Sequence, residues 1–104
     1  MNKRSYKLQY LPLFYQDLEE TIDYIANVLK SPETAMNLIN EVEAAILKRL
    51  EMPTAYETYN SKRERKYPYY RIYVKNYIVF YTVIDDVMEV RRFLYGARDL
   101  NRLV

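Results

Sequence analysis

The 104-residue sequence contains no cysteine, histidine or tryptophan, and it has a single glycine. Without cysteine, the chain forms no disulfide, no thiolate zinc site and no thiol nucleophile. Without histidine, it lacks the commonest metal ligand and the commonest general base at neutral pH. A metal site built from carboxylates alone stays open, but we expect no cofactor. Any catalysis must use Lys, Arg, Tyr, Asp, Glu, Ser or Thr.

Long hydrophobic runs are also missing. No apolar stretch approaches the length of a membrane span, and Lys7, Gln9 and Pro12 interrupt the segment that would have to form a signal-peptide core. We therefore expect a cytoplasmic protein without a membrane partner. With half of its residues hydrophobic and 29% charged, the chain has the composition of a globular protein. Its length predicts one domain over residues 1–104.

Charge is distributed unevenly along the chain. Residues 1–52 carry six basic and eight acidic side chains, whereas residues 53–104 carry ten basic and six acidic ones. Within 61–75, Glu64 is the single acid among six cations, which are Lys62, Arg63, Arg65, Lys66, Arg71 and Lys75. Cations interleaved with tyrosines suit phosphate backbones and stacked bases. A solvated basic loop is the alternative interpretation.

The first half of the sequence predicts a strand followed by two helices. Residues 5–11 alternate in part and indicate a strand. Pro12 suits the first turn of a helix, and the spacing of Phe14, Leu18, Ile22, Ile25 and Leu29 places these side chains on one helical face. Pro32 begins a second helix, which Pro53 ends. The short connection predicts an antiparallel helical hairpin.

The second half predicts a loop and a three-stranded meander. Residues 53–68 are polar and basic, without a clear period, and indicate a loop. Strands over 69–74, 77–84 and 87–95 are joined by the two-residue turns Lys75-Asn76 and Asp85-Asp86. The predicted fold is α+β, in the order strand-helix-helix-strand-strand-strand. The helical hairpin packs on one face of a four-stranded, mainly antiparallel sheet and leaves the other face open.

Strand alternation suggests which side chains lie on the open face. We expect the outward set to comprise Tyr69, Arg71 and Tyr73, then Tyr77, Val79, Tyr81 and Val83, then Glu89, Arg91, Phe93 and Tyr95, with Met88, Val90 and Leu94 inward. A strict two-residue turn would pair Val74 with Tyr77 and oppose this choice, so a bulge or longer turn would be needed. Arg92 falls on the inward side, which requires a second bulge or an edge position. The resulting tyrosine-rich face would bind nucleic acid or a partner protein.

Several short sequence motifs occur in a fixed order along the second half of the chain. They are Tyr70-Arg71, Asn76-Tyr77, Phe80-Tyr81-Thr82-Val83 and Leu94-Tyr95-Gly96-Ala97-Arg98-Asp99. Together they resemble the RelE/ParE superfamily of bacterial toxins over most of the chain. The resemblance implies the toxin of a type II toxin–antitoxin module, held inactive by a cognate antitoxin. RelE-like members enter the ribosomal A site and cleave mRNA, whereas ParE-like members act on DNA gyrase.

The resemblance also suggests a site. For a metal-free, ribosome-dependent endoribonuclease, which is our first hypothesis, Arg71 would stabilise the transition state and Tyr95 would assist as a general acid. Lys66 or Glu64 would be the base. Nucleic-acid contacts would come from Lys62, Arg63, Arg65, Tyr69, Tyr73, Arg91, Arg92 and Arg98. The alternatives are a gyrase-directed toxin without catalysis, which the ending at 94–99 favours, and an inert antitoxin-binding relative.

Overall fold

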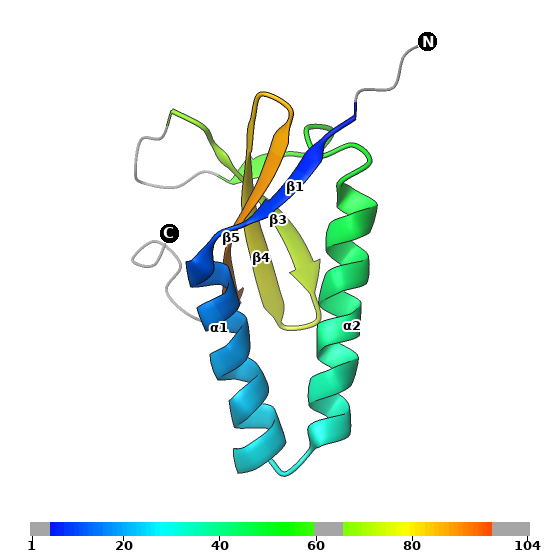
Figure 1. Ribbon diagram of the computed structural model, residues 1–104, viewed down its shortest axis with the longest axis vertical. Helices are drawn as coiled ribbons and strands as arrows, with labels where there is room; N and C mark the ends of the chain where they lie inside the picture. The colour runs from blue at the N-terminus through cyan, green and yellow to red at the C-terminus, as the bar shows by residue number, and fades with distance from the viewer. Residues whose placement is uncertain (1–4, 60–65, 97–104) are drawn as a thin grey trace.

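The computed structural model describes residues 5–59 and 66–96, which form two α-helices, a π-helical turn and five strands (Figure 1). In chain order the elements are β1 (Lys7–Tyr10), α1 (Pro12–Asp23), η1 (Tyr24–Val28), α2 (Pro32–Arg49), β2 (Thr58–Tyr59), β3 (Tyr69–Val74), β4 (Tyr77–Ile84) and β5 (Val87–Tyr95). The predicted α+β class and the order of the main elements are confirmed.

Both helices begin at a proline, as the sequence predicts, because the first helical position needs no N–H donor. The apolar faces of α1, η1 and α2 are buried through Phe14, Ile25, Leu38 and Val42, among others. Leu29, however, is 55% exposed. The π-helical turn η1 precedes it, and its N–H reaches back five residues to the carbonyl of Tyr24. The wider turn removes Leu29 from the buried stripe.

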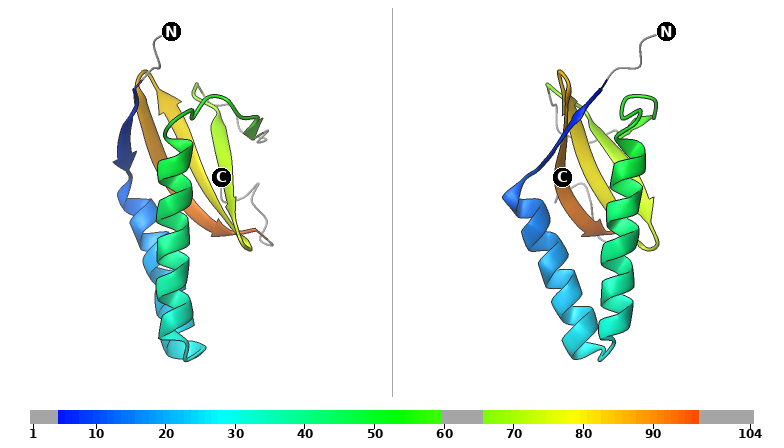
Figure 2. Two further views of the ribbon diagram at one scale, coloured as in Figure 1. Left: turned by 90° about the vertical axis from the view of Figure 1, so that its right-hand side faces the viewer. Right: turned by 45° about the vertical axis from the view of Figure 1, so that its right-hand side comes forward.

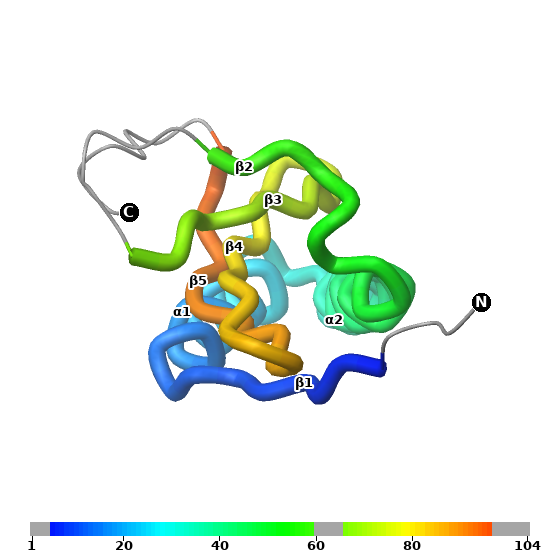
Figure 3. Tube along the Cα trace, turned by 90° about the horizontal axis from the view of Figure 1, so that it is seen from above, coloured from blue at the N-terminus to red at the C-terminus, as the bar shows by residue number. Residues whose placement is uncertain are grey.

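The sheet has the order β1-β5-β4-β3-β2, so that β1 and β2 lie at its two edges (Figure 3). β1 runs parallel to β5, and the other pairs are antiparallel. The fifth strand corrects the expected four-stranded sheet. It comes from the segment predicted as a loop, where Thr58 and Tyr59 pair with Tyr70 and Tyr69.

The direction of the β4 side chains corrects the sequence-based choice. Val74 pairs directly with Tyr77 across a two-residue turn in which Lys75 takes a φ of 53°, so no bulge intervenes there. Strand alternation then directs Tyr77, Val79, Tyr81 and Val83 toward the helices, where they belong to the main core. A buried phenol is tolerated because the hydroxyl of Tyr81 forms two hydrogen bonds.

A bulge in β5 accounts for the remaining differences. Phe80 pairs with Arg92 while Tyr81 pairs with Val90, which leaves Arg91 without a partner in the ladder. The extra residue reverses the alternation beyond it. Met88 and Val90 face the helices as expected, but Phe93 and Tyr95, predicted to face outward, share the helix side with Tyr77. Leu94, predicted to face inward, belongs instead to the cluster on the opposite face.

The face opposite the helices, here called the outer face, is largely covered, which corrects the expected open face. Tyr69, Ile78, Phe80 and Leu94 are all buried there and form a second, smaller hydrophobic cluster. The helical hairpin extends past the end of the sheet (Figures 1 and 2). A recess therefore forms beside η1 at the C-terminal end of β5.

Candidate functional site

Arg71 projects from β3 onto the outer face, since its cross-strand partner Phe80 belongs to the outer cluster. Its guanidinium carbon lies 5.0 Å from the ring centroid of Tyr59 and 5.8 Å from that of Tyr73. Such cation–π contacts orient a guanidinium without neutralising its charge. Within residues 5–59 and 66–96, no carboxylate forms an ion pair with Arg71. Arg71 can therefore accept an anionic partner.

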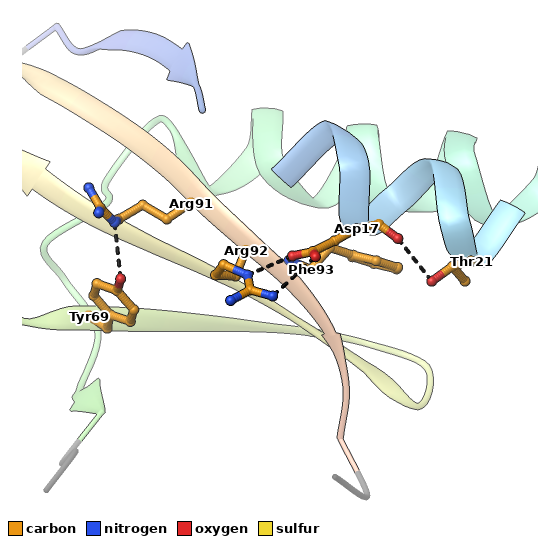
Figure 4. Close-up of polar contacts among 6 residues, drawn as sticks. All are labelled: Asp17, Thr21, Tyr69, Arg91, Arg92 and Phe93. Atoms are coloured by element: carbon orange, nitrogen blue, oxygen red, sulfur yellow. Dashed lines mark hydrogen bonds and ion pairs between the residues drawn. The ribbon is translucent and has the colours of Figure 1, made fainter. Parts of the chain in front are cut away.

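Arg91, the bulge residue, is held more firmly. Its Nε donates a hydrogen bond to the hydroxyl of Tyr69 at 3.0 Å (Figure 4). Its Nη1 pairs with the carboxylate of Glu89. Burial opposes its charge, but the bonds to Tyr69 and Glu89 raise the pKa of Arg91 above its ordinary value. Tyr69 itself is only 6% exposed. Its ring therefore supports Arg91 and does not offer a stacking surface for a base.

Arg92 points toward α1 and forms a bidentate pair with Asp17 (Figure 4). Its Nε and Nη2 lie 2.7 Å and 3.1 Å from the two carboxylate oxygens. The same carboxylate accepts the backbone N–H of Phe93 at 3.0 Å. β1 ends at Tyr10, opposite Val90, so beyond that point Asp17 takes the place of a neighbouring strand. Arg92 thus joins α1 to the edge of β5.

Tyr95 lies at the end of β5 with 43% of its surface exposed. It pairs with Tyr77, and the two rings meet edge to face at a centroid distance of 5.6 Å. Tyr77 packs into the core on the helix side. Strand alternation thus directs Tyr95 and Arg71, the two residues expected to share a catalytic site, to opposite faces of the sheet. At the end of the strand, Tyr95 also borders a hollow that Tyr73 and Ile78 of the outer face line, and Arg71 does not border that hollow.

Among the other predicted contact residues, Tyr73 is 64% exposed on the outer face. Lys66 is exposed just before β3, with its ammonium 5.5 Å from the ring centroid of Tyr67. The remaining predicted site residues, which are Lys62, Arg63, Glu64, Arg65 and Arg98, lie outside the described residues. In the part of the chain that is described, no three acidic side chains gather to hold a metal ion, and no helix is long and apolar enough to cross a membrane.

The sequence interpretation missed Arg49 and Asp17, which position the elements around these sites. Arg49 ends α2 and donates hydrogen bonds of 2.9 Å to the carbonyl of Arg71 and the hydroxyl of Tyr81. Its guanidinium also lies 3.5 Å from the ring centroid of Tyr56. In the sequence, both residues resemble ordinary solvated charges on a helix. Asp17 could have been noticed, because it lies three residues after Phe14 and therefore borders the predicted apolar face.

Comparisons with known proteins agree with this fold. A family model described as "ParE toxin of type II toxin-antitoxin system, parDE" matches residues 8–100. No curated protein matches the sequence. A solved structure of the chromosomal ParDE TA system from P. aeruginosa is similar, with a TM-score of 0.66, 14% identity, and 86% of this chain and 95% of that chain covered. YafQ from E. coli strain BL21(DE3) is similar with a TM-score of 0.55, 15% identity, and 89% of this chain and 96% of that chain covered.

Proposed function

The chain belongs to the ParE toxin family of type II toxin–antitoxin systems, and on that premise we propose that it poisons DNA gyrase by binding, without cleaving mRNA. It is a toxin of the RelE/ParE superfamily, with a cognate antitoxin as its partner. The finer choice of target rests on the distribution of the candidate site residues. Fold alone does not decide it, because one fold carries different activities.

The separation of Arg71 and Tyr95 is the observation that carries the proposal. Metal-free RNA cleavage needs charge stabilisation and proton transfer around a single phosphate, with each group within hydrogen-bonding reach of it. Strand alternation directs these two side chains to opposite faces, and their positions lie on either side of β4 at different levels of the ladder, Arg71 beside Phe80 and Tyr95 beside Tyr77, which does not bring them to one phosphate.

A binding role fits the outer face better. Arg71 keeps its charge beside the rings of Tyr59 and Tyr73. Tyr73 is an exposed residue of the same strand, and the exposed Tyr67 lies just before that strand. Arginine and tyrosine are the residue types that most often dominate protein interfaces, because they bury large areas and still form polar bonds. We assign Arg71, Tyr73 and Lys66 to the contact with gyrase. Three further residues support that surface from beneath or from its edge, and they are Tyr69, Arg91 and Arg92.

Two purified systems test the choice of target. In the first, the protein is added to gyrase with relaxed plasmid and ATP, and we expect loss of supercoiling together with accumulated cleavage complexes. In the second, it is added to a reconstituted translation reaction, and the 5′ ends of the reporter mRNA are mapped. We expect no new ends. Codon-phased cuts in the mRNA, with gyrase unaffected, would contradict the proposal and favour the endoribonuclease. Addition of the cognate antitoxin should abolish the effect in either system.

A further inference from the structure

A cavity of about 700 Å³ lies between the end of α1, η1 and the C-terminal end of β5. Its lining residues come from α1, from the segment 24–29 and from the ends of β4 and β5. Three tyrosines from different elements contribute to its lining, and they are Tyr24, Tyr77 and Tyr95. Neither Arg71 nor Tyr73 borders it. The cavity therefore lies away from Arg71 and Tyr73, although Leu94 of the outer cluster also contributes to its lining.

The tyrosines form a partly rigid aromatic wall. The ring of Tyr77 stacks on Phe93 at a centroid distance of 4.9 Å, and Tyr95 meets its other side edge to face. Tyr24 and Tyr95 remain 53% and 43% exposed, so ring surface is available to a ligand. Burial raises the pKa of Tyr77, and the neighbouring phenols of Tyr95 and Tyr24 raise it further. All three tyrosines thus border the same cavity.

The charges around the cavity leave one carboxylate uncompensated. Asp17 and Arg92 both line the cavity but neutralise each other through their bidentate pair. The hydroxyl of Thr21 donates to the carbonyl of Asp17. Glu20 is exposed, and within residues 5–59 and 66–96 no cation forms an ion pair with it. The cavity therefore combines a carboxylate with aromatic faces, a combination that attracts cations.

We propose that this cavity binds one arginine side chain presented by a protein partner. The planar guanidinium would stack on the ring of Tyr24 or Tyr95 and direct its N–H fork at the carboxylate of Glu20. The exposed side chain of Leu29 and the side chain of Leu94 would contact the methylene stem, which favours a long, amphipathic residue. Lysine fits less well, because its compact ammonium neither stacks nor donates a bidentate fork.

Nuclear magnetic resonance tests the proposal on the intact, isotope-labelled chain. The probe is N-acetyl-arginine amide, and N-acetyl-citrulline amide is its neutral match in shape. We expect saturable shifts of the amide signals of Thr21, Tyr24 and Tyr95 at millimolar arginine amide. Citrulline amide should bind at least about fivefold more weakly, since it lacks the positive charge on which the cation–π and carboxylate contacts depend.

Variants at exposed positions extend the test without threatening the fold. Glu20→Gln should weaken arginine amide about fivefold, whereas Glu19→Gln, one residue away and outside the cavity lining, should not. Tyr24→Leu should also weaken it by about fivefold. Equal binding of citrulline amide or of N-acetyl-lysine amide, shifts confined to the outer face, or no response to Glu20→Gln would each overturn the proposal.

Discussion

Arg49 and Tyr81 are joined by a 2.9 Å hydrogen bond from a guanidinium N–H to a phenol that is fully buried between helix and sheet. Tyr81 in turn donates to the carbonyl of Pro53 at 2.7 Å, and Arg49 also donates to the carbonyl of Arg71. The pair therefore connects the end of α2, the segment after it and two central strands. Buried polar groups of this kind stabilise a fold only while all of them remain paired.

Removal of the Tyr81 hydroxyl should destabilise the protein. Tyr81→Phe keeps the ring but leaves the carbonyl of Pro53 and one N–H of Arg49 without their partner in a region shielded from water. We expect a loss of about 1–3 kcal/mol in the free energy of unfolding, measured by urea denaturation. Tyr73→Phe is the matched control on an exposed strand position and should change stability by less than about 0.5 kcal/mol. Equal effects of the two substitutions would contradict this account.

The same phenol should make stability dependent on alkaline pH. Burial raises the pKa of Tyr81 from 10.0 to about 12, partly offset by the bond and charge of Arg49. Below pH 10 the phenol is neutral in both states, so its contribution is complete. Between about pH 10 and 12 the unfolded chain ionises first, and the contribution falls by about 1.4 kcal/mol per pH unit. The stability advantage of the wild type over Tyr81→Phe should shrink across this window, and a constant difference would rule out the mechanism.

The pair between Asp17 and Arg92 should contribute more than an ordinary surface ion pair. Both side chains are mostly buried, at 11% and 19% exposure, and Asp17 also satisfies the N–H of Phe93. We expect Asp17→Ala to cost about 3–4 kcal/mol, because it leaves a charge and a backbone donor unpaired. A double-mutant cycle with Arg92→Ala should give a coupling of about 1–3 kcal/mol.

The pair between Lys75 and Glu41 provides the comparison. Its side chains are 56% and 44% exposed, with 3.4 Å between Nζ and Oε1. Glu41→Gln should cost at most about 1 kcal/mol. If Glu41→Gln lowers the free energy of unfolding as much as Asp17→Ala does, the buried position of Asp17 at the edge of β5 does not strengthen its ion pair.

Substitutions at Arg71 and Tyr95 separate binding from catalysis. Arg71→Ala should reduce gyrase poisoning at least about tenfold, since it removes a charged contact on the outer face. Lys75→Ala, an exposed cation just beyond β3, is the control and should have little effect. Tyr95→Phe should leave toxicity unchanged in cells at equal expression. A loss of about a hundredfold with Tyr95→Phe would indicate that the hydroxyl takes part in chemistry.

Much of the local structure follows from the sequence. The prolines at 12 and 32 mark the helix starts, the spacing of Phe14, Leu18 and Ile22 marks the buried stripe, and the Lys75-Asn76 turn marks the hairpin. These features depend on neighbours within a few residues, for which propensity and periodicity are sufficient. The ordered strings at 70–99 also indicate the toxin superfamily, in agreement with the family model.

The sequence predicted less well which side chains of each strand point toward the helices. The two faces of β4 are similarly hydrophobic, so the alternation of side chains does not indicate which face is buried. The phenol of Tyr81 suggested an exposed position, yet its burial is favourable because it accepts a tertiary hydrogen bond from Arg49 and donates one to the carbonyl of Pro53. Thr58 and Tyr59 form a strand only because β3 supplies a ladder beside them.

By itself, then, the sequence determined the order of the elements, their helical or extended character, the absence of thiol and imidazole chemistry, and the superfamily. The tertiary structure decided which side chains share a surface. Arg91 has no partner in the ladder between β4 and β5, and this extra residue reverses the alternation of β5. Tyr95 is therefore directed to the helix side, while Arg71 lies on the outer face. The break in alternation at Arg92 indicated a bulge or an edge position in this strand, and the registry between β4 and β5 and the carboxylate of Asp17 at the edge of β5 show that both occur.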